Sequence, residues 1–434
     1  MAINSTLSAA EVRTLTSPSL RVDYRVFYEF LDTRRGTPPN ADITPFLEID
    51  KSVIARKSGG NVPGSARLYF TNRILRDGQF VEFPLTDTWP EVAVTIQAIC
   101  STGTVGSVSQ VVSFDLGKWL LRRPRPTLNL SAGKSQTILF ELSEWIIALS
   151  GSVGKTIGWD AGDNFWDVCI RELLDDYRDQ DLRQRSVVRR VSRPDFTLDH
   201  SIAVPWKLGN RVDWLVQDDA SYLHIANRLL SASGWAKLYS NRQGVLTTYE
   251  FVPIAERRPL WTISLTEENW IESRSQVNYP RDTVPNRWIG VELPGSNRSP
   301  FNVETVELVN EDGSLRNAET GQTLYSGVGL STSQQRTNRV ETRVVNMDPG
   351  DSEDGTPRRS TESALAWTAL VDMQQAASLD IPMRTLPIFW HFENVEVDIP
   401  VLGNDFRQTR GVVTEWSLPL DSARSMTLKV EVPI

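Results

Sequence analysis

The sequence predicts an α+β protein that is mainly β, and three observations lead to this prediction. Runs in which apolar and polar residues alternate dominate residues 21–114 and return after residue 261. Turn-forming stretches such as "RDGQF" and "STGTVGS" separate these runs. Three other stretches carry apolar residues at helical spacing, so a few helices should accompany the strands.

Composition limits the classes of function. The chain has 434 residues and a formal net charge of −8, which predicts two to four domains and no basic footprint for binding nucleic acid. An acidic surface would still let DNA pass without holding it. The 14 tryptophans favour rigid packing or interfaces. The two cysteines, Cys100 and Cys169, do not make a disulfide framework, and Cys169 is expected to be a small core residue.

The N-terminal segment, residues 1–20, is rich in serine and threonine and is predicted to be an extended arm. It lacks the basic start and apolar run of a signal peptide. No stretch of the sequence approaches the ~20 apolar residues of a membrane-spanning helix. We therefore expect a protein without a membrane anchor, made in a cytoplasm.

A first β-domain is predicted for residues 21–120. Two of its runs alternate with a period of two, as half-buried strands do. The apolar positions of these two runs are Val22, Tyr24, Val26 and Tyr28, then Val92, Val94 and Ile96.

Residues 121–195 are predicted to form a linker and a helix-containing domain. The linker is "LRRPRPTL", residues 121–128, because Pro124 and Pro126 exclude a regular helix and remove donors from a strand ladder. Its arginines are expected to be solvated loop charges that lie away from any channel: Arg122, Arg123 and Arg125.

The helix of this domain is predicted from "GDNFWDVCIRELLDDYRDQ", with Asp163 or Asn164 as its N-cap. Its apolar residues recur at helical spacing and form one wide face. They are Phe165, Trp166, Cys169, Ile170, Leu173, Leu174 and Tyr177.

A helix followed by a hairpin is predicted for residues 196–260. The helix has an apolar stripe made of Tyr222, Ile225, Ala226, Leu229 and Leu230. Asp219 is its candidate cap, Gly234 is expected to end it, and Trp235 is expected to begin a strand. Asn241 to Gly244 should form the polar turn between "WAKLY" and "VLTTYEF".

A second β-domain is predicted for residues 261–434. It should contain strands at "NRWIGVEL" and "ETVELV", an exposed hairpin at "NEDGSLRNAETGQT", a loop at 347–360 and a helix at about 362–378. The helix is expected to place four residues near one side: Leu365, Thr368, Val371 and Met373. Three closing strands follow, at "VEVDIPVLG", "GVVTEWSLPL" and "SMTLKVEVPI".

The sequence offers no convincing catalytic, cofactor or metal site. Gly133, Lys134 and Ser135 resemble the end of a phosphate loop, but Leu128 stands where that motif needs its first glycine. The three histidines are isolated and have no metal-ligand spacing: His200, His224 and His391. Four clustered acids are expected to form a solvated, salt-bridged helix face rather than a glycosidase pair: Asp175, Asp176, Asp179 and Asp181.

The segment "VDWLVQDDASYLHIANRLLSASGWAKLYSNRQGVLTTYEF" resembles the middle of bacteriophage tail-hub proteins, also called baseplate-hub or tail-tip hub proteins. Members of this family have a helix ending in two leucines, then a glycine, an aromatic residue and a second glycine before a strand. The matching residues here are Leu229, Leu230, Gly234, Trp235 and Gly244. Weaker similarity extends in order over residues 160–434, including "DNFWDVCIRELLDDY", "YPRDTVPNRWIGVEL" and the closing strands.

The resemblance implies a structural virion protein at the distal end of a phage tail. Each subunit would have two tail-tube-like β-barrels, built from discontinuous segments, with smaller helix-containing inserted domains. A homotrimer would match its six barrels to a hexameric tail or tail-tube ring, carry a central spike or fibre, and surround the channel for DNA. Such a trimer would have a formal charge of 3 × −8 = −24, which suits a channel that does not hold phosphate.

Two other functions remain open from the sequence. A tail-associated protein that binds carbohydrate or a receptor would also use a β-rich fold with tryptophans, although three helices argue against a plain lectin sandwich. A cell-wall hydrolase would need a carboxylate pair or a metal cluster in a cleft, and neither is evident in the sequence.

Overall fold

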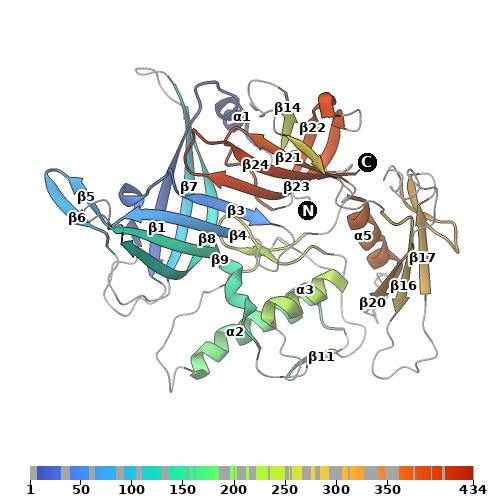
Figure 1. The fold of residues 1–434 in the computed structure, drawn as a ribbon. Helices are drawn as coiled ribbons and strands as arrows, with labels where there is room; N and C mark the ends of the chain where they lie inside the picture. Colours follow the sequence, from blue (N-terminus) through green and yellow to red (C-terminus); the bar gives the residue numbers. More distant parts are fainter. Residues whose placement is uncertain are drawn as a thin grey trace.

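A computed structural model gives the fold (Figure 1). It describes residues 7–433 except for 31–39, 58–63, 85–91, 104–109, 129–135, 154–155, 161, 185–195, 200, 203–211, 215–220, 233–234, 250–253, 255–256, 266–274, 279–283, 293–304, 311–312, 327–341, 348–360, 375–376, 392 and 403–405. Within these residues the protein is mainly β with a few helices, as predicted.

A 13-stranded sheet forms the largest part of the molecule. Its N-terminal half contains β1 (Arg21–Phe30), β2 (Asn40–Asp42), β3 (Val53–Lys57), β4 (Gly64–Thr71), β7 (Val92–Thr102), β8 (Gln110–Leu128) and β9 (Gln136–Glu144). Its C-terminal half contains β14 (Trp261–Ser264), β15 (Gln276–Asn278), β21 (Ala377–Met383), β22 (Asn394–Asp398), β23 (Thr409–Pro419) and β24 (Met426–Val432). The strand order is β15-β21-β24-β23-β3-β4-β9-β8-β7-β1-β2, with β22 paired to β23 and β14 to β22.

The two halves meet where β3 pairs antiparallel with β23, from Lys57 opposite Glu415 to Val53 opposite Pro419. The other half of the same β23 edge pairs with β22. The curve of the N-terminal half is completed by the segment after β2, where Leu47 forms a bridge with Phe70 of β4. The main sheet therefore joins strands that lie more than 350 residues apart in the sequence.

The predicted alternation in the first β-domain is confirmed. The expected apolar positions of β1 and β7 are all buried: Val22, Tyr24, Val26 and Tyr28, then Val92, Val94 and Ile96. Each buried strand face contributes to one core that runs through both halves of the sheet. Cys100 is buried in this core.

A second core lies beneath the main sheet and contains the helices α2 (Arg171–Gln184) and α3 (Tyr222–Ala232). A π-helix, η5 (Phe165–Ile170), leads directly into α2, and the Asn164 side chain caps it by accepting from the N–H groups of Trp166 and Asp167. Five residues of the predicted stripe are buried: Trp166, Cys169, Ile170, Leu173 and Tyr177. Leu174 packs partly buried against the same core, and the side chain of Phe165 lies outside the described residues. Two small ladders accompany the helices, β10 (Ile157–Trp159) with β11 (Val212–Trp214) and β12 (Tyr239–Ser240) with β13 (Leu246–Thr247).

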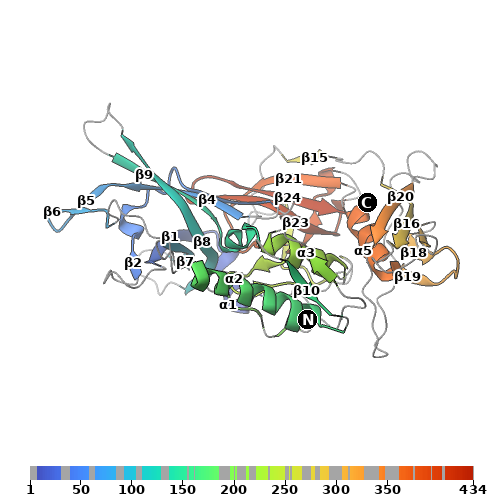
Figure 2. The same cartoon turned by 90° about the horizontal axis from the view of Figure 1, so that it is seen from below.

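A third core lies between the helix α5 (Thr361–Gln374) and a five-stranded sheet, at the end of the molecule beside the C-terminal strands (Figure 2). The sheet contains β16 (Arg287–Glu292), β17 (Thr305–Asn310), β18 (Ser314–Asn317), β19 (Thr323–Ser326) and β20 (Thr342–Met347). The predicted strands β16 and β17 and the pairing of the hairpin β18–β19 are confirmed. The expected exposure of this hairpin is wrong for β18, because Leu315 is fully buried in the third core.

Two predictions about the N-terminal half are wrong. Residues 9–15 are not an extended arm but the helix α1 (Ala9–Leu15), which begins with a capping box between Ser8 and Glu11. Residues 121–128 are not a linker but the end of β8, paired with β9 from Leu121 to Leu128. Pairing with β7 stops at Leu120, so Pro124 and Pro126 lie where one side of β8 has no neighbouring strand in the described chain, a position that tolerates proline.

Further corrections concern the predicted helix at 362–378 and Trp235. The helix α5 ends at Gln374, because Ala377 already begins β21. Its buried apolar residues are Leu365, Ala366, Ala369, Leu370 and Met373. Leu365 and Met373 of the predicted set are thus buried and Thr368 is half-buried, whereas the side chain of Val371 lies outside the described residues. Trp235 occupies a single bridge position, and the strand that follows begins at Tyr239.

Several predicted features lie outside the described residues: the phosphate-loop-like Gly133 to Ser135, Asp219, Gly234 and most of the loop 347–360. The boundaries of the predicted domains stay predictions. No helix in the described part of the chain is long and apolar enough to cross a membrane.

Candidate functional site: a buried junction around the central hairpin

The hairpin β12–β13, predicted from its polar turn, lies at the junction between the helical core and the two halves of the main sheet. Asn241 closes the turn, because its N–H donates to the carbonyl of Val245 and its side-chain oxygen accepts from the N–H groups of Gln243 and Val245. Gly244 has a φ of +85°, a conformation that favours glycine. A Cβ at Gly244 would lie 3.1 Å from the Cβ of Lys118, so glycine also permits close approach to β8.

Arg242 of the turn binds both halves of the main sheet through backbone carbonyls. Its guanidinium donates to the carbonyl oxygens of Asp115 in β8 and of Pro387, each at 3.2 Å, and to that of Ile388. A guanidinium has five N–H donors in a fixed plane, which suits it to several acceptors at once. This one side chain therefore connects the hairpin to segments 127 and 145 residues away in the sequence.

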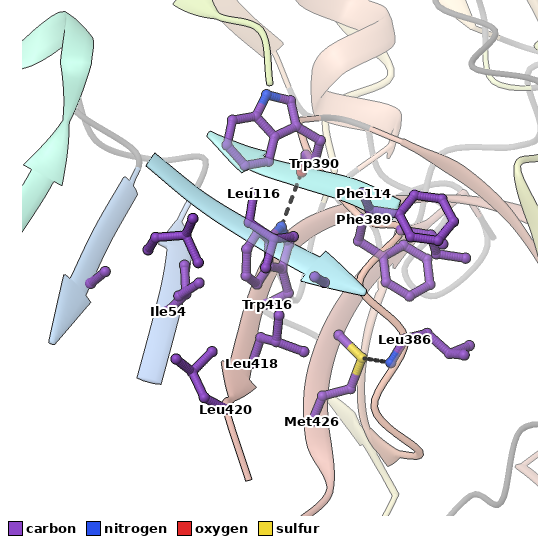
Figure 3. Packing of buried hydrophobic residues seen from close by; sticks show 14 of the residues in the cluster. Ile54, Phe114, Leu116, Leu386, Phe389, Trp390, Trp416, Leu418, Leu420 and Met426 are labelled. Carbon is purple, nitrogen blue, oxygen red and sulfur yellow. Dashed lines mark hydrogen bonds between the residues drawn. The ribbon is translucent and has the colours of Figure 1, made fainter. Parts of the chain in front are cut away.

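Trp390 occupies the centre of the junction. Its indole N–H donates to the carbonyl of Ser240 in β12 (3.0 Å), and its own carbonyl accepts from the indole N–H of Trp416 in β23 (3.1 Å). Figure 3 shows this second bond and the surrounding apolar side chains. A Cβ at Gly117 would lie 2.3 Å from the ring of Trp390, and Gly117 has a φ of +91°, so only glycine fits at this bulge of β8.

A buried cluster of ionisable groups lies beside Trp390. It consists of Arg56 from β3, Glu144 at the end of β9, and His391. One Glu144 oxygen, Oε1, lies 2.5 Å from Nη2 of Arg56 and 3.2 Å from Nε2 of His391, and it accepts from the Ser240 hydroxyl at 2.7 Å. The Arg56 guanidinium also stacks 3.6 Å from the centre of the Trp390 ring. The side chains of all three ionisable residues are at most 4% exposed.

Burial and pairing set the charges of this cluster. Burial alone would raise the pKa of Glu144, but Arg56 and His391 hold that pKa well below its usual value. Burial, followed by the charge of Arg56, lowers the pKa of His391 to about 4, against the opposing effect of Glu144. A pKa of about 4 leaves His391 neutral at pH 7, and its Nε2 lies within hydrogen-bond distance of Nη2 of Arg56, which can only donate, and of the Glu144 carboxylate, which can only accept. The cluster is thus a buried Arg56–Glu144 ion pair with a neutral His391.

This chemistry favours a structural role for the cluster. Nucleophilic or acid–base catalysis requires that a substrate reach the reacting group, whereas these side chains are enclosed by Trp390, Tyr239 and the hairpin. A broken buried ion pair costs far more than an exposed one. The cluster therefore couples the hairpin, through Ser240, to β3 and β9, which lie on either side of β4 in the main sheet.

The residues of the sequence motif lie around this junction. Leu229 and Leu230 are buried in the second core, as predicted. The N–H of Trp235 donates to the carbonyl of Leu230 at 2.9 Å, the long-range bond of a Schellman helix end. Asn227 accepts from the N–H of Leu238 at 2.8 Å, which fixes the hairpin to α3. The motif thus specifies how the helix passes into the hairpin.

The other candidates from the sequence have structural roles or none in the described residues. Asp176 accepts a hydrogen bond from the Tyr222 hydroxyl at 3.0 Å and so joins α2 to α3. His224 is exposed. His200 and the side chains of Asp179 and Asp181 lie outside the part of the chain that the structure describes. No group of three potential metal ligands occurs among the described residues. His391 is isolated in the sequence but not in the fold, which places it beside Glu144, 247 residues away in the chain.

Comparison with known proteins identifies the fold. No protein-family model matches the chain, and no curated protein matches it in sequence. Solved structures do: the 43 kDa tail protein of prophage MuSo2 from Shewanella oneidensis has a TM-score of 0.54 at 10% identity, over 95% of this chain and 99% of its own. The tail protein of Neisseria meningitidis MC58 gives 0.53 at 9% identity, over 94% and 96%. The prophage tail protein gp18 of Listeria monocytogenes EGD-e gives 0.50 at 9%, over 94% of each chain.

These likenesses span nearly the whole of each chain. At such low identity they establish the fold alone. The resemblance to phage tail proteins stated from the sequence is confirmed at that level.

Proposed function

We propose that this chain, which has the fold of phage tail proteins, is a structural subunit of a tail: a trimeric hub at its distal end. In this position it adapts a hexameric tail or tail-tube ring to a threefold spike or fibre and surrounds the DNA channel. The observation that carries the proposal is the fold match over 95% of this chain and 99% of the Shewanella tail protein.

The charge and the buried junction support the same proposal. The net charge of −8 per chain suits a channel wall that DNA passes without being held, since each cation facing phosphate would bind it and release counterions. The junction around Trp390 makes the hairpin a rigid part of the β-structure. Rigid elements suit a subunit whose work is contact with neighbours.

Native mass spectrometry tests the proposal. The chain has a mass of 48.9 kDa, so we expect the purified protein to have three times that mass, with ring-shaped particles in negative stain. A monomer at micromolar concentration, with a sugar or peptidoglycan fragment bound in a cleft, would instead support the carbohydrate-binding or hydrolase alternatives.

A further inference from the structure

An exposed hairpin projects from the N-terminal half of the main sheet, at the end of the molecule farthest from the five-stranded sheet (Figures 1 and 2). It contains β5 (Arg73–Arg76) and β6 (Gln79–Glu82). Asp77 and Gly78 form its two-residue turn with φ values of +51° and +78°, the type I′ signature that matches the twist of a hairpin. Its base is held by Phe83, which is buried against Phe46, Phe70 and Phe140. The hairpin β5–β6 is therefore a short arm whose base is packed into the core and whose tip projects from it.

The arm carries solvent-exposed apolar side chains. Leu75 and Phe80 lie directly opposite each other on one face and are 65% and 67% exposed, and Val81 on the other face is 39% exposed. No other described strand pairs with either edge of this two-stranded sheet. An isolated hairpin with open edges is only marginally stable in water and invites pairing with another chain. These features are typical of an element that is covered in an assembly.

A second surface on the same chain has matching properties. The four-residue strand β14 pairs along one edge with β22, and no described strand pairs with its other edge. Just beyond the ends of these parallel strands, Leu265 is 53% exposed and Val401 is 76% exposed. The free edge of β14 is as long as β5 or β6, at four residues each. Within the described residues, the chain thus has an apolar arm in its N-terminal half and, in its C-terminal half, an apolar site with an edge that no described strand covers.

The charges of the two surfaces are complementary. The Arg73 guanidinium lies 4.6 Å from the centre of the Phe80 ring, on the face of the arm that carries Leu75. Glu82 lies directly opposite Arg73 on this face, but Arg73 forms no ion pair with it or with another described residue. Asp398, opposite Ser264 at the end of β22, is half-buried and likewise has no ion-pair partner among the described residues. A positive charge on the arm and a negative charge at the site would favour one orientation of contact.

We propose that the β5–β6 arm of one copy docks on the β14–β22 end of a second copy, with Arg73 facing Asp398 and with Leu75 and Phe80 covering Leu265 and Val401. This inference rests on the proposed trimer and names the surfaces that hold it together. Two different surfaces on each chain give a head-to-tail contact, which closes into a ring when the rotation between copies allows it. The N-terminal half of each subunit would then alternate with the C-terminal half of the next around the ring.

A charge exchange measured by sedimentation velocity tests the docking. Arg73→Asp and Asp398→Arg should each raise the dissociation constant of self-association by about tenfold or more, because each places like charges opposite each other. The double variant should recover wild-type association. Arg76→Asp is the matched control, since Arg76 lies on the other face of the arm beside Asp77, and should change association little. At a protein concentration low enough to dissociate the wild type, the melting temperatures of all variants should stay close to that of the wild type, which separates association from folding.

A cross-linking experiment gives a second readout. Chains with Phe80→Cys and chains with Val401→Cys are mixed, and a bifunctional maleimide should join the two kinds to each other. The native Cys100 and Cys169 interfere little, because burial raises the pKa of each thiol to about 12.

The outcomes separate this inference from the proposed function. If the wild type is a trimer, both single charge variants associate as tightly as it does, and no mixed cross-link forms, the proposed docking is wrong while the trimeric hub is still supported. The arm would then contact a different tail protein. A wild-type protein that stays monomeric overturns both.

Discussion

Two hairpins of this protein have similar turn chemistry and opposite surroundings. In β12–β13, the turn residue Arg242 binds backbone carbonyls of two other segments, and both strands are buried. In β5–β6, every residue of the second strand is exposed. A turn sequence thus predicts that a hairpin forms, whereas its burial decides whether it holds the fold together or offers a surface. Changes at the first should affect unfolding, and changes at the second should affect association.

The largest effect should come from breaking the buried ion pair beside the first hairpin. Arg56→Met leaves the Glu144 carboxylate buried without its cation and should lower the free energy of unfolding by about 3–5 kcal/mol. Removing both charges, with Arg56→Met and Glu144→Leu together, should recover part of this loss. The neighbouring Lys57, whose contact with Glu415 is 3.8 Å and largely exposed, is the control, and Lys57→Met should cost less than about 1 kcal/mol. Equal losses for the two single variants would contradict the assigned role of the cluster.

A pH dependence of stability should arise from His391 in the same cluster. Its pKa is about 4 in the folded protein and 6.5 in an unperturbed chain, so the unfolded state takes up a proton first as the pH falls. The contribution of His391 to the free energy of unfolding is therefore fully present above pH 6.5. It is lost as the pH falls to about 4, which lowers the free energy of unfolding by about 3 kcal/mol. Urea unfolding at pH 7, 5.5 and 4 should show this loss in the wild type, and His391→Gln should lack that component. Parallel pH profiles for the two proteins would refute it.

A matched pair of glycines compares the two turns directly. Gly244 and Gly78 have nearly equal φ values of +85° and +78°, but a Cβ meets Lys118 at the first and nothing within 4 Å at the second. Gly78→Ala should cost about 1 kcal/mol for the left-handed conformation alone. Gly244→Ala should cost clearly more, because the hairpin must also move from β8. Thermal unfolding of both variants measures the difference, and equal costs would show that close approach to Lys118 does not matter.

The smallest effect on folding should come from the tip of the second hairpin. Phe80→Ser removes a side chain that is 67% exposed and should change the free energy of unfolding by no more than about 0.5 kcal/mol. Phe70→Ala, at a fully buried ring near the base of the same hairpin, should cost about 3–5 kcal/mol. A large loss of stability in Phe80→Ser would mean that the arm is part of the folded core.

Local patterns in the sequence predicted local structure well. The alternation in β1, the N-cap at Asp163 or Asn164 and the turn at Asn241 depend on residues within a few positions of one another. All three are confirmed, with Asn164 as the cap. The capping box of Ser8 and Glu11 is equally local, and this spacing indicates the start of a helix at a place where serine and threonine content alone predicts an extended arm.

The junction could not be predicted in the same way. His391 contacts Arg56 across 335 residues, and the pairing of β3 with β23 has a similar separation. No spacing rule reports such contacts, because they follow from which strands pair. The prolines of β8 show the converse: their missing donors indicated a linker, and only the end of the neighbouring strand β7 reveals that one edge of β8 can tolerate them.

Single-particle cryo-electron microscopy of the purified chain tests the central proposal most directly, because it reports symmetry and channel together. We expect a threefold ring in which six β-rich units alternate around an open bore with an acidic or neutral wall. A particle with another symmetry would contradict the proposed hub. A threefold ring whose bore is lined by Arg122, Arg123 and Arg125 would contradict the proposed passage of DNA along a wall that does not hold it.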